Sequence, residues 1–124
     1  MFFESSLEEL LKKLEEARNQ FWNIDRSTAL FMYSLIRASN FKNVLEIGTS
    51  NGYSGIWIAK ALQITNGELV TVESNDIRYN LANENFIKAN VNSLILQIKG
   101  HAPEVLKSIE SKQFDLIFVD ATKA

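Results

Sequence analysis

From residue 43 onwards, short apolar runs alternate with amphipathic stretches of helical periodicity. Strands that are separated by helices of about ten residues indicate βαβ units, which build a parallel sheet. Right-handed crossovers then place helices on both faces of that sheet. The sequence therefore predicts an α/β fold. The expected strands cover 43–47, 68–73, 93–99 and 114–120, and the expected helices between them cover 53–62, 76–90 and 102–110.

Two amphipathic helices are expected before this alternation begins. Leucines at helical spacing give the first helix an apolar stripe, and Ser5 or Ser6 is expected to cap it. Asp25 is the expected N-cap of the second helix, and Asp76 is that of the helix after the second strand. The two N-terminal helices cover 5–17 and 23–40, and they lie in a helical segment, 1–40, of a single domain that spans 1–124.

The composition is that of an ordinary soluble globular protein and argues against several other classes. Of the 124 residues, 46% are hydrophobic and 23% are charged, and the formal net charge of -2 gives no basic excess for nucleic-acid binding. The chain has no cysteine, so neither disulfides nor cysteine-ligated metals are expected. No apolar run approaches the roughly 20 residues of a membrane span, and the start lacks the pattern of a signal peptide. We therefore expect a cytoplasmic protein without a membrane partner.

The last expected strand contains an uninterrupted apolar run from Leu116 to Val119. Such a run is typical of a strand with neighbours on both sides and cover on both faces. The sequence ends five residues later, at Ala124, and would leave a bare apolar edge, which soluble proteins usually avoid. This conflict suggests a truncated chain or an edge that a second subunit covers. A small sheet whose edge is twisted or shielded is the alternative.

A glycine-rich turn joins the first expected strand to the next helix, in the stretch VLEIGTSNGYSG at 44–55. Parallel α/β sheets bind ligands beyond the carboxyl ends of their strands, and a helix N-terminus there offers free N–H groups and a partial positive charge. A dinucleotide site favours G-x-G-x-x-G, but here the spacing is G-x-x-x-G-x-x-G, with Ser50 in place of the middle glycine. Glu46 would also lie close to the phosphates. S-adenosylmethionine has no phosphate and carries a sulfonium and an ammonium group, so the turn and its acid favour that ligand.

A second acid, Glu73, ends the next expected strand about 20 residues past the turn, where a carboxylate accepts hydrogen bonds from ribose hydroxyls. A single Glu at a strand end is more often a surface residue, but two acids at consecutive strand ends with a glycine turn between them favour a nucleoside ligand. Asp120, at the carboxyl end of the last strand, is a functional candidate for the same geometric reason. On its own, Lys123 is typical of a solvated side chain. His101, the sole histidine, fits a turn residue and a neighbour of the nucleoside equally well.

Four segments, VLEIGTSNGYSGIWIAKAL, LVTVES, KGHAPEVL and FDLIFVDATK, resemble in their order and spacing the small metal-dependent class I O-methyltransferases, which include catechol and caffeoyl-CoA O-methyltransferases. The resemblance runs from FWNID to VDATKA. It implies a Rossmann-like parallel sheet with strand order 3-2-1-4, truncated relative to the seven-stranded sheet of that family. It also implies S-adenosylmethionine as cofactor, a divalent cation such as Mg²⁺, and methyl transfer to a hydroxyl group of a small catechol-like acceptor.

The positions that match the family's cofactor site fall into three groups. The methionine end of the cofactor is matched by Glu46, Gly48, Thr49, Ser50, Gly52, Tyr53 and Ser54, the adenosine by Glu73, Ser74, His101 and Ala102, and a closing segment by Trp22, Asn23 and Ile24. The resemblance further implies that Asp120 is a metal ligand that also borders the cofactor, and that Lys123 is the general base. A lysine close to a dication has a depressed pKa and can take up a proton.

The family continues beyond the point where this sequence ends, with further strands, the remaining metal ligands and most of the acceptor pocket. Mg²⁺ favours near-octahedral oxygen coordination, so Asp120 alone is too few ligands to hold it. Three functions therefore stay open: an S-adenosylmethionine-dependent O-methyltransferase, a non-catalytic binding or interaction module that keeps the nucleoside pocket, and a nicotinamide-dependent oxidoreductase, against which the turn spacing argues. A tRNA hydroxyuridine is the alternative acceptor, although the net charge gives it no support.

Overall fold

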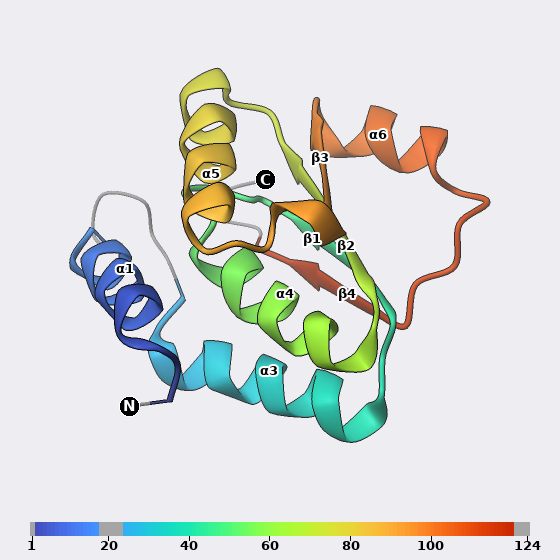
Figure 1. Cartoon of the computed structure of the whole chain (residues 1–124). Coiled ribbons are helices and arrows are strands. Elements are labelled where there is room, and N and C mark those ends of the chain that lie inside the picture. Colours follow the sequence, from blue (N-terminus) through green and yellow to red (C-terminus); the bar gives the residue numbers. More distant parts are fainter. Residues whose placement is uncertain (1, 18–23, 121–124) are drawn as a thin grey trace.

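Four parallel strands form one sheet in the described part of the chain, which comprises residues 2–17 and 24–120 of this computed structural model (Figure 1). The strands are β1 (Asn43–Ile47), β2 (Glu68–Glu73), β3 (Ile95–Lys99) and β4 (Leu116–Val119). Their spatial order is β3-β2-β1-β4, and every neighbouring pair is parallel. The α/β class and the 3-2-1-4 order are therefore confirmed. All four carboxyl ends lie at the same edge of the sheet.

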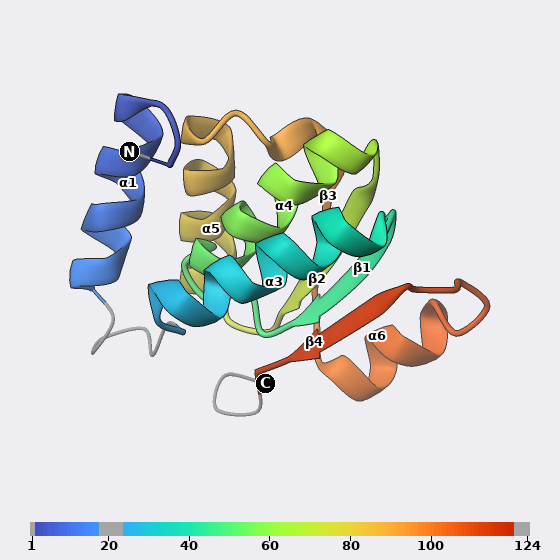
Figure 2. The same ribbon diagram turned by 90° about the horizontal axis from the view of Figure 1, so that it is seen from below.

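Helices cover both faces of the sheet, as the crossover rule predicts. They are α1 (Ser5–Glu16), α3 (Arg26–Ser39), α4 (Tyr53–Thr65), α5 (Asp76–Lys88) and α6 (Ala102–Ser108), with a short 3-10 helix, η1 (Asn92–Leu94), before β3. Figure 2 shows α1, α3, α4 and α5 on one face and α6 on the other. The main core lies on the first face, while a smaller core joins Val105 of α6 to Leu45 and Ile47 of β1.

The helix after the first strand, α4, is buried along most of its length. The four consecutive residues from Ile56 to Ala59 point to all sides of this helix, and all four are essentially inaccessible to solvent. A helix that is apolar all round is stable only where other elements surround it, and α4 packs against α3, β2 and α5. Its position fixes the start of α4 at the carboxyl edge of the sheet.

No helix among the described residues is both long enough and apolar enough to span a bilayer.

The start of α1 differs from the prediction. Glu4 holds the N-cap position and the helix begins at Ser5, so the predicted cap by Ser5 or Ser6 is wrong. The carboxylate of Glu8 instead accepts a hydrogen bond from the backbone N–H of Phe3 at 3.0 Å. An ionised carboxylate is a stronger acceptor than a hydroxyl, and it satisfies the backbone that precedes the helix.

Side chains cap α3 and α5 at their N-termini. Asp25 accepts a hydrogen bond from a backbone N–H in the first turn of α3 at 2.9 Å, which confirms the predicted cap. For α5 the predicted cap, Asp76, is wrong by one residue, because the side chain of Asn75 accepts the backbone N–H of the first turn at 3.0 Å. Asp76 is the first helical residue, and its carboxylate forms an ion pair with Lys99 of β3.

The edge strand β4 exposes part of its apolar run. Leu116 and Phe118 pack against the main core, whereas Ile117 and Val119 point to the opposite face and are 57% and 54% exposed. Strand β4 pairs only with β1 among the described strands. The bare apolar edge that the sequence predicts is thus present in this part of the chain. Association of a second subunit through it stays a prediction.

Asp115 joins the start of β4 to the start of β1. Its carboxylate accepts hydrogen bonds from the backbone N–H groups of Lys42 at 2.8 Å and of Asn43 at 3.0 Å. Its own N–H donates to the carbonyl of Asn43 at 2.7 Å. The two N–H groups stabilise the ionised form and hold the pKa of the Asp115 carboxyl below its usual value.

Replacing Asp115 by Asn is expected to lower the melting temperature at neutral pH, because a neutral amide oxygen is a weaker acceptor than a carboxylate. A carboxyl group with a lowered folded-state pKa stabilises the fold above its unfolded pKa of about 4, and this contribution is lost as the pH falls through the folded value. Melting curves of the two proteins should therefore differ at neutral pH and converge in acid. A gap that stays constant down to acid pH would contradict this account.

Candidate functional site at the strand ends

The chain turns sharply between β1 and α4, at the carboxyl edge of the sheet. Gly48, Ser50 and Gly52 have φ angles of 97°, 55° and 93°, which lie in the left-handed region that glycine adopts without steric cost. The N–H groups of Gly48 and Thr49 both donate to one carbonyl of β2, at 2.9 and 3.2 Å, and fix the turn to that strand. Helix α4 begins directly after Gly52. The N–H groups of its first turn have no partner within the helix and lie at this edge.

Glu46, the acid of the turn motif, is fully buried beneath the turn. Its carboxylate accepts hydrogen bonds from the hydroxyl of Ser54 and from that of Thr71, the latter at 2.7 Å. The hydroxyls of Thr71 and Thr49 lie 2.6 Å apart. The carboxylate therefore links β1 to β2 and to the start of α4. Glu46 supports the turn from below, and its direct contact with a cofactor stays a prediction.

Three further buried side chains build the turn, although the glycine motif does not point to them. The amide of Asn85, on α5, donates to the backbone carbonyl of Asn51 at 2.8 Å, and the side-chain oxygen of Asn51 accepts the N–H of Tyr53 at 3.1 Å. Thr71 binds Glu46 as described above. A signal for Thr71 was available, because a polar residue inside the apolar strand ELVTVE needs a polar partner. Asn85 gave no such signal, since many residues of α5 are polar.

Glu73 ends β2 beside the turn, as the sequence predicts, and its carboxylate is almost completely buried. One oxygen accepts the N–H of Ser50 at 2.7 Å, and the other accepts the N–H of Asn75 at 3.1 Å. A carboxylate has about four acceptor positions, so these two bonds leave capacity for further donors. The acid lies between the glycine turn and the loop that follows β2. A ligand that crosses both strand ends would pass over it.

A small recess lies beside these strand ends, and it brings together four of the residues predicted for the cofactor: Gly48, Ser74, His101 and Ala102. Ile47, Val72 and Gly100 complete its lining. Its volume of about 20 Å³ has room for about one water molecule. His101 holds the N-cap position of α6, and its side chain is exposed. An adenine ring is therefore too large to enter the recess, but it could lie against the residues that line it.

Ile24 is the only residue of the predicted closing segment, 22–24, that falls within the described ranges. It is half-buried and packs against the main core beside α3. Trp22, Asn23 and Lys123 lie outside the described residues. The roles of these four residues stay predictions.

Asp120 follows β4 at the same sheet edge as the turn. Its N–H donates to the carbonyl of Ile47 at 3.1 Å, and its side chain is half-buried. Within 2–17 and 24–120, no group of three or more acidic or histidine side chains could hold a metal ion. The donor set in these ranges therefore does not fit a complete divalent-cation site.

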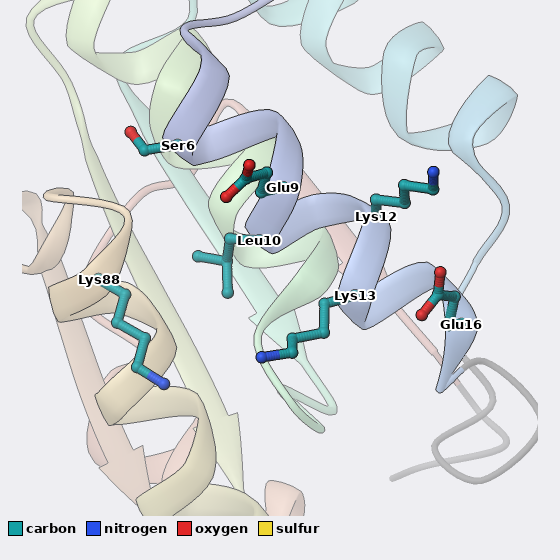
Figure 3. Close-up of a pocket in the computed structure, with 7 residues that line it drawn as sticks. All are labelled: Ser6, Glu9, Leu10, Lys12, Lys13, Glu16 and Lys88. Carbon is teal, nitrogen blue, oxygen red and sulfur yellow. The ribbon is translucent and has the colours of Figure 1, made fainter.

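A groove of about 560 Å³ runs between α1 and α5 (Figure 3). Lys13 and Lys88 extend toward its opening, and Leu10 forms part of its wall. Because solvated lysines and glutamates lie side by side in this open groove, it does not favour a ligand of either charge. The groove is lined by Ser6, Glu9, Leu10, Lys12, Lys13, Glu16 and Lys88, none of which the sequence predicts for the cofactor.

Comparison with known proteins adds a family to this geometry. The family model described as O-methyltransferase matches residues 3–124. A catechol O-methyltransferase of Niastella koreensis is 34% identical over 113 residues, which cover 89% of this chain and 51% of that relative.

Solved structures of similar proteins agree with the sequence match. An O-methyltransferase from Bacillus cereus, in complex with S-adenosylhomocysteine, has a TM-score of 0.81 at 34% identity. The match covers 96% of this chain and 55% of the Bacillus cereus chain. An O-methyltransferase from Streptomyces achromogenes that is involved in tomaymycin synthesis, in complex with S-adenosylmethionine, has a TM-score of 0.81 at 32% identity. The match covers 91% of this chain and 53% of the Streptomyces achromogenes chain. The chain thus spans about half the length of these relatives. With a match along nearly all of its sequence and the glycine turn at its strand ends, it belongs to the O-methyltransferase family.

Proposed function

We propose that this chain forms the cofactor-binding part of an S-adenosylmethionine-dependent O-methyltransferase that acts on a hydroxyl group of a small, catechol-like acceptor. The observation that carries the proposal is the pair of buried carboxylates at adjacent strand ends, Glu46 below the glycine turn and Glu73 beside it. Glu46, directly beneath the turn, opposes a pyrophosphate and favours a ligand with cationic groups, and Glu73 is placed to accept hydrogen bonds from the ribose hydroxyls of a nucleoside. The complexes of similar solved structures with S-adenosylmethionine and S-adenosylhomocysteine support the same ligand class.

Each part of the site has a matching part of the cofactor. The N–H groups that follow Tyr53 in the first turn of α4 would bind the carboxylate of the methionine moiety. Glu73 would accept hydrogen bonds from the ribose hydroxyls with its remaining acceptor capacity. Ser74, His101 and Ala102, around the recess, would border the adenine ring. Gly48 and Gly52 allow the backbone to approach the ligand closely.

In the transfer itself, the acceptor oxygen attacks the methyl carbon, the carbon–sulfur bond breaks, and the sulfonium becomes a neutral thioether. The hydroxyl proton leaves to a base, a role that we assign to Lys123. Much of the acceleration would come from holding the two reactants in line. A divalent cation such as Mg²⁺, with Asp120 as one ligand, belongs to this proposal through the resemblance alone, because the described residues do not complete its site.

Isothermal titration calorimetry of the 124-residue chain with S-adenosylmethionine, S-adenosylhomocysteine and NADH tests the proposal. We expect the two adenosyl ligands to bind and NADH not to bind. Methyl transfer to catechol, with and without Mg²⁺, then tests turnover, and a hydroxyuridine-containing tRNA tests the alternative acceptor. Binding of the adenosyl ligands without transfer to any acceptor would indicate a binding module, and preferential binding of NADH would overturn the assignment.

A further inference from the structure

Four side chains, Glu8, Glu15, Arg26 and Tyr53, join three helices and are here called the Arg26 cluster. Arg26, the first residue of α3, binds Glu8 through Nη2 at 2.9 Å and Glu15 through Nε at 2.8 Å, and both acids belong to α1. The hydroxyl of Tyr53, the first residue of α4, donates to Glu15 at 2.6 Å. The guanidinium and the phenol meet at the same oxygen of Glu15, its Oε2.

The Arg26 cluster is partly withdrawn from solvent. The side chains of Glu8, Glu15 and Arg26 are 14%, 29% and 38% exposed, and Tyr53 is buried. The guanidinium also lies over the ring of Trp57, 5.3 Å from its centroid. Burial, followed by the hydrogen bond and charge of Glu15, raises the pKa of Tyr53, so its hydroxyl remains a donor at neutral pH. Charge-assisted hydrogen bonds of this kind are stronger than those of fully exposed ion pairs.

Apolar contacts already attach α1 to the main core through Leu7, Leu11 and Leu14. Apolar burial is non-directional, so these leucines alone leave the helix free to shift along its contact surface. The Arg26 cluster supplies the missing direction, because Glu15 must meet a guanidinium nitrogen and a phenol hydroxyl at once. The cluster therefore sets where α1 lies relative to α3 and α4.

Tyr53 connects this cluster to the glycine turn. Its backbone N–H donates to the side chain of Asn51 at 3.1 Å, and it directly follows Gly52, whose φ is 93°. The next residue, Ser54, donates to the buried carboxylate of Glu46. The side chain of Tyr53 thus reaches α1 while its backbone forms part of the turn. A shift of α1 would be passed directly to the start of α4.

We propose that Glu15 and Arg26 are positioning residues for the cofactor: they hold Tyr53, and through it the first turn of α4, in the geometry that binds S-adenosylmethionine. The N-terminal helix is then a support of the cofactor site, although none of its residues lines the strand-end recess. The identity of the ligand rests on the proposed function, whereas the coupling between α1 and the turn rests on the contacts of the Arg26 cluster.

The test measures the Kd for S-adenosylhomocysteine of the 124-residue chain and of its Tyr53→Phe, Glu15→Gln and double variants. Each single variant is expected to bind about three- to tenfold more weakly, since Tyr53→Phe removes a hydrogen bond to a charged group and Glu15→Gln replaces the charged acceptor by a weaker, neutral one. Both changes act on the same bond between Tyr53 and Glu15, so the double variant is expected to bind about as weakly as the weaker single variant. Arg26→Lys, which keeps a cation beside Glu15, should restore most of the affinity that Arg26→Met loses.

Two controls separate positioning from a general loss of stability. Glu16→Gln, at an exposed neighbour on α1, should bind as the wild type does. Ile36→Val, in the main core, should lower the melting temperature without changing the Kd. Wild-type affinity in Tyr53→Phe and Glu15→Gln, or effects that simply add in the double variant, would overturn the proposal.

Hydrogen exchange at the first turn of α4 gives a readout that needs no ligand. The amide of Ile56, which donates to the carbonyl of Gly52 at 2.9 Å, should exchange faster in Tyr53→Phe and Glu15→Gln than in the wild type, because α4 loses its link to α1. If the wild type binds no adenosyl ligand, the proposed function fails, and the exchange rates still decide the coupling. Unchanged rates in both variants would overturn it.

Discussion

Replacing Gly67 by Ala is expected to lower the free energy of unfolding by about 3 kcal/mol. Gly67 lies between α4 and β2, where the chain passes close to the residue before β1. A Cβ at this position would overlap the carbonyl oxygen of Lys42 and would lie 2.7 Å from its Cα and 2.8 Å from a methyl carbon of Leu62. The backbone of Lys42 cannot move aside freely, because its carbonyl accepts the N–H of Glu68 at 2.8 Å. The methyl group would therefore separate β1 from β2.

Thermal melting of the Gly67→Ala variant should show this loss as a fall of roughly 10 °C or more in melting temperature. Asn66→Gly is the matched control at the neighbouring position. Asn66 ends α4 in the left-handed region with φ of 61°, which glycine also adopts, so this variant should melt close to the wild type. A Gly67→Ala protein as stable as Asn66→Gly would show that the two strands can separate without cost.

Replacing Glu73 by Gln is expected to weaken the binding of S-adenosylhomocysteine at least about tenfold, because the ribose hydroxyls lose a charged acceptor. The amide has nearly the same volume, but its nitrogen donates rather than accepts. It can therefore satisfy only one of the two N–H groups, of Ser50 and Asn75, that the carboxylate now binds. Calorimetric titration of the folded variant measures the loss, and its melting temperature reports the unsatisfied N–H group separately.

Glu68→Gln is the control for this change. Glu68 begins the strand that Glu73 ends, and its side chain is exposed at the opposite edge of the sheet. The same chemical change there should leave both the Kd and the melting temperature unaltered. Equal affinities of Glu73→Gln and the wild type would remove Glu73 from the cofactor site.

Local patterns in the sequence predicted the sheet well, and their errors fall where a side chain or a short turn decides the boundary. β1 and β2 begin and end at the predicted residues, since polar or glycine residues flank both apolar runs. β3 begins at Ile95 rather than Ser93, because Ser93 and Leu94 belong to η1 and the apolar run conceals the change of backbone. β4 begins after Asp115, whose side chain is engaged with the start of β1.

The site could be predicted only as far as neighbouring strand ends define it. Consecutive strands of the sheet place Glu46, the glycine turn and Glu73 at one edge, and the pattern of acids and glycines indicated that edge. The direction in which Glu46 points depends on Thr71, 25 residues away, and the support of the turn by Glu15 depends on a contact across 38 residues. Such pairings follow from packing in three dimensions, so a reading of local spacing does not contain them.

Glu46 and Thr71 lie opposite each other in the pairing of β1 with β2, between Leu45 opposite Val70 and Ile47 opposite Val72. If the two strands slipped by one residue, the carboxylate would face a valine in a dry interior, and leaving it there without a donor would cost several kcal/mol. The hydrogen bond between the acid and the threonine thus favours the native register of β1 and β2. A misaligned sheet is selected against during folding by the same residues that later shape the ligand-binding edge.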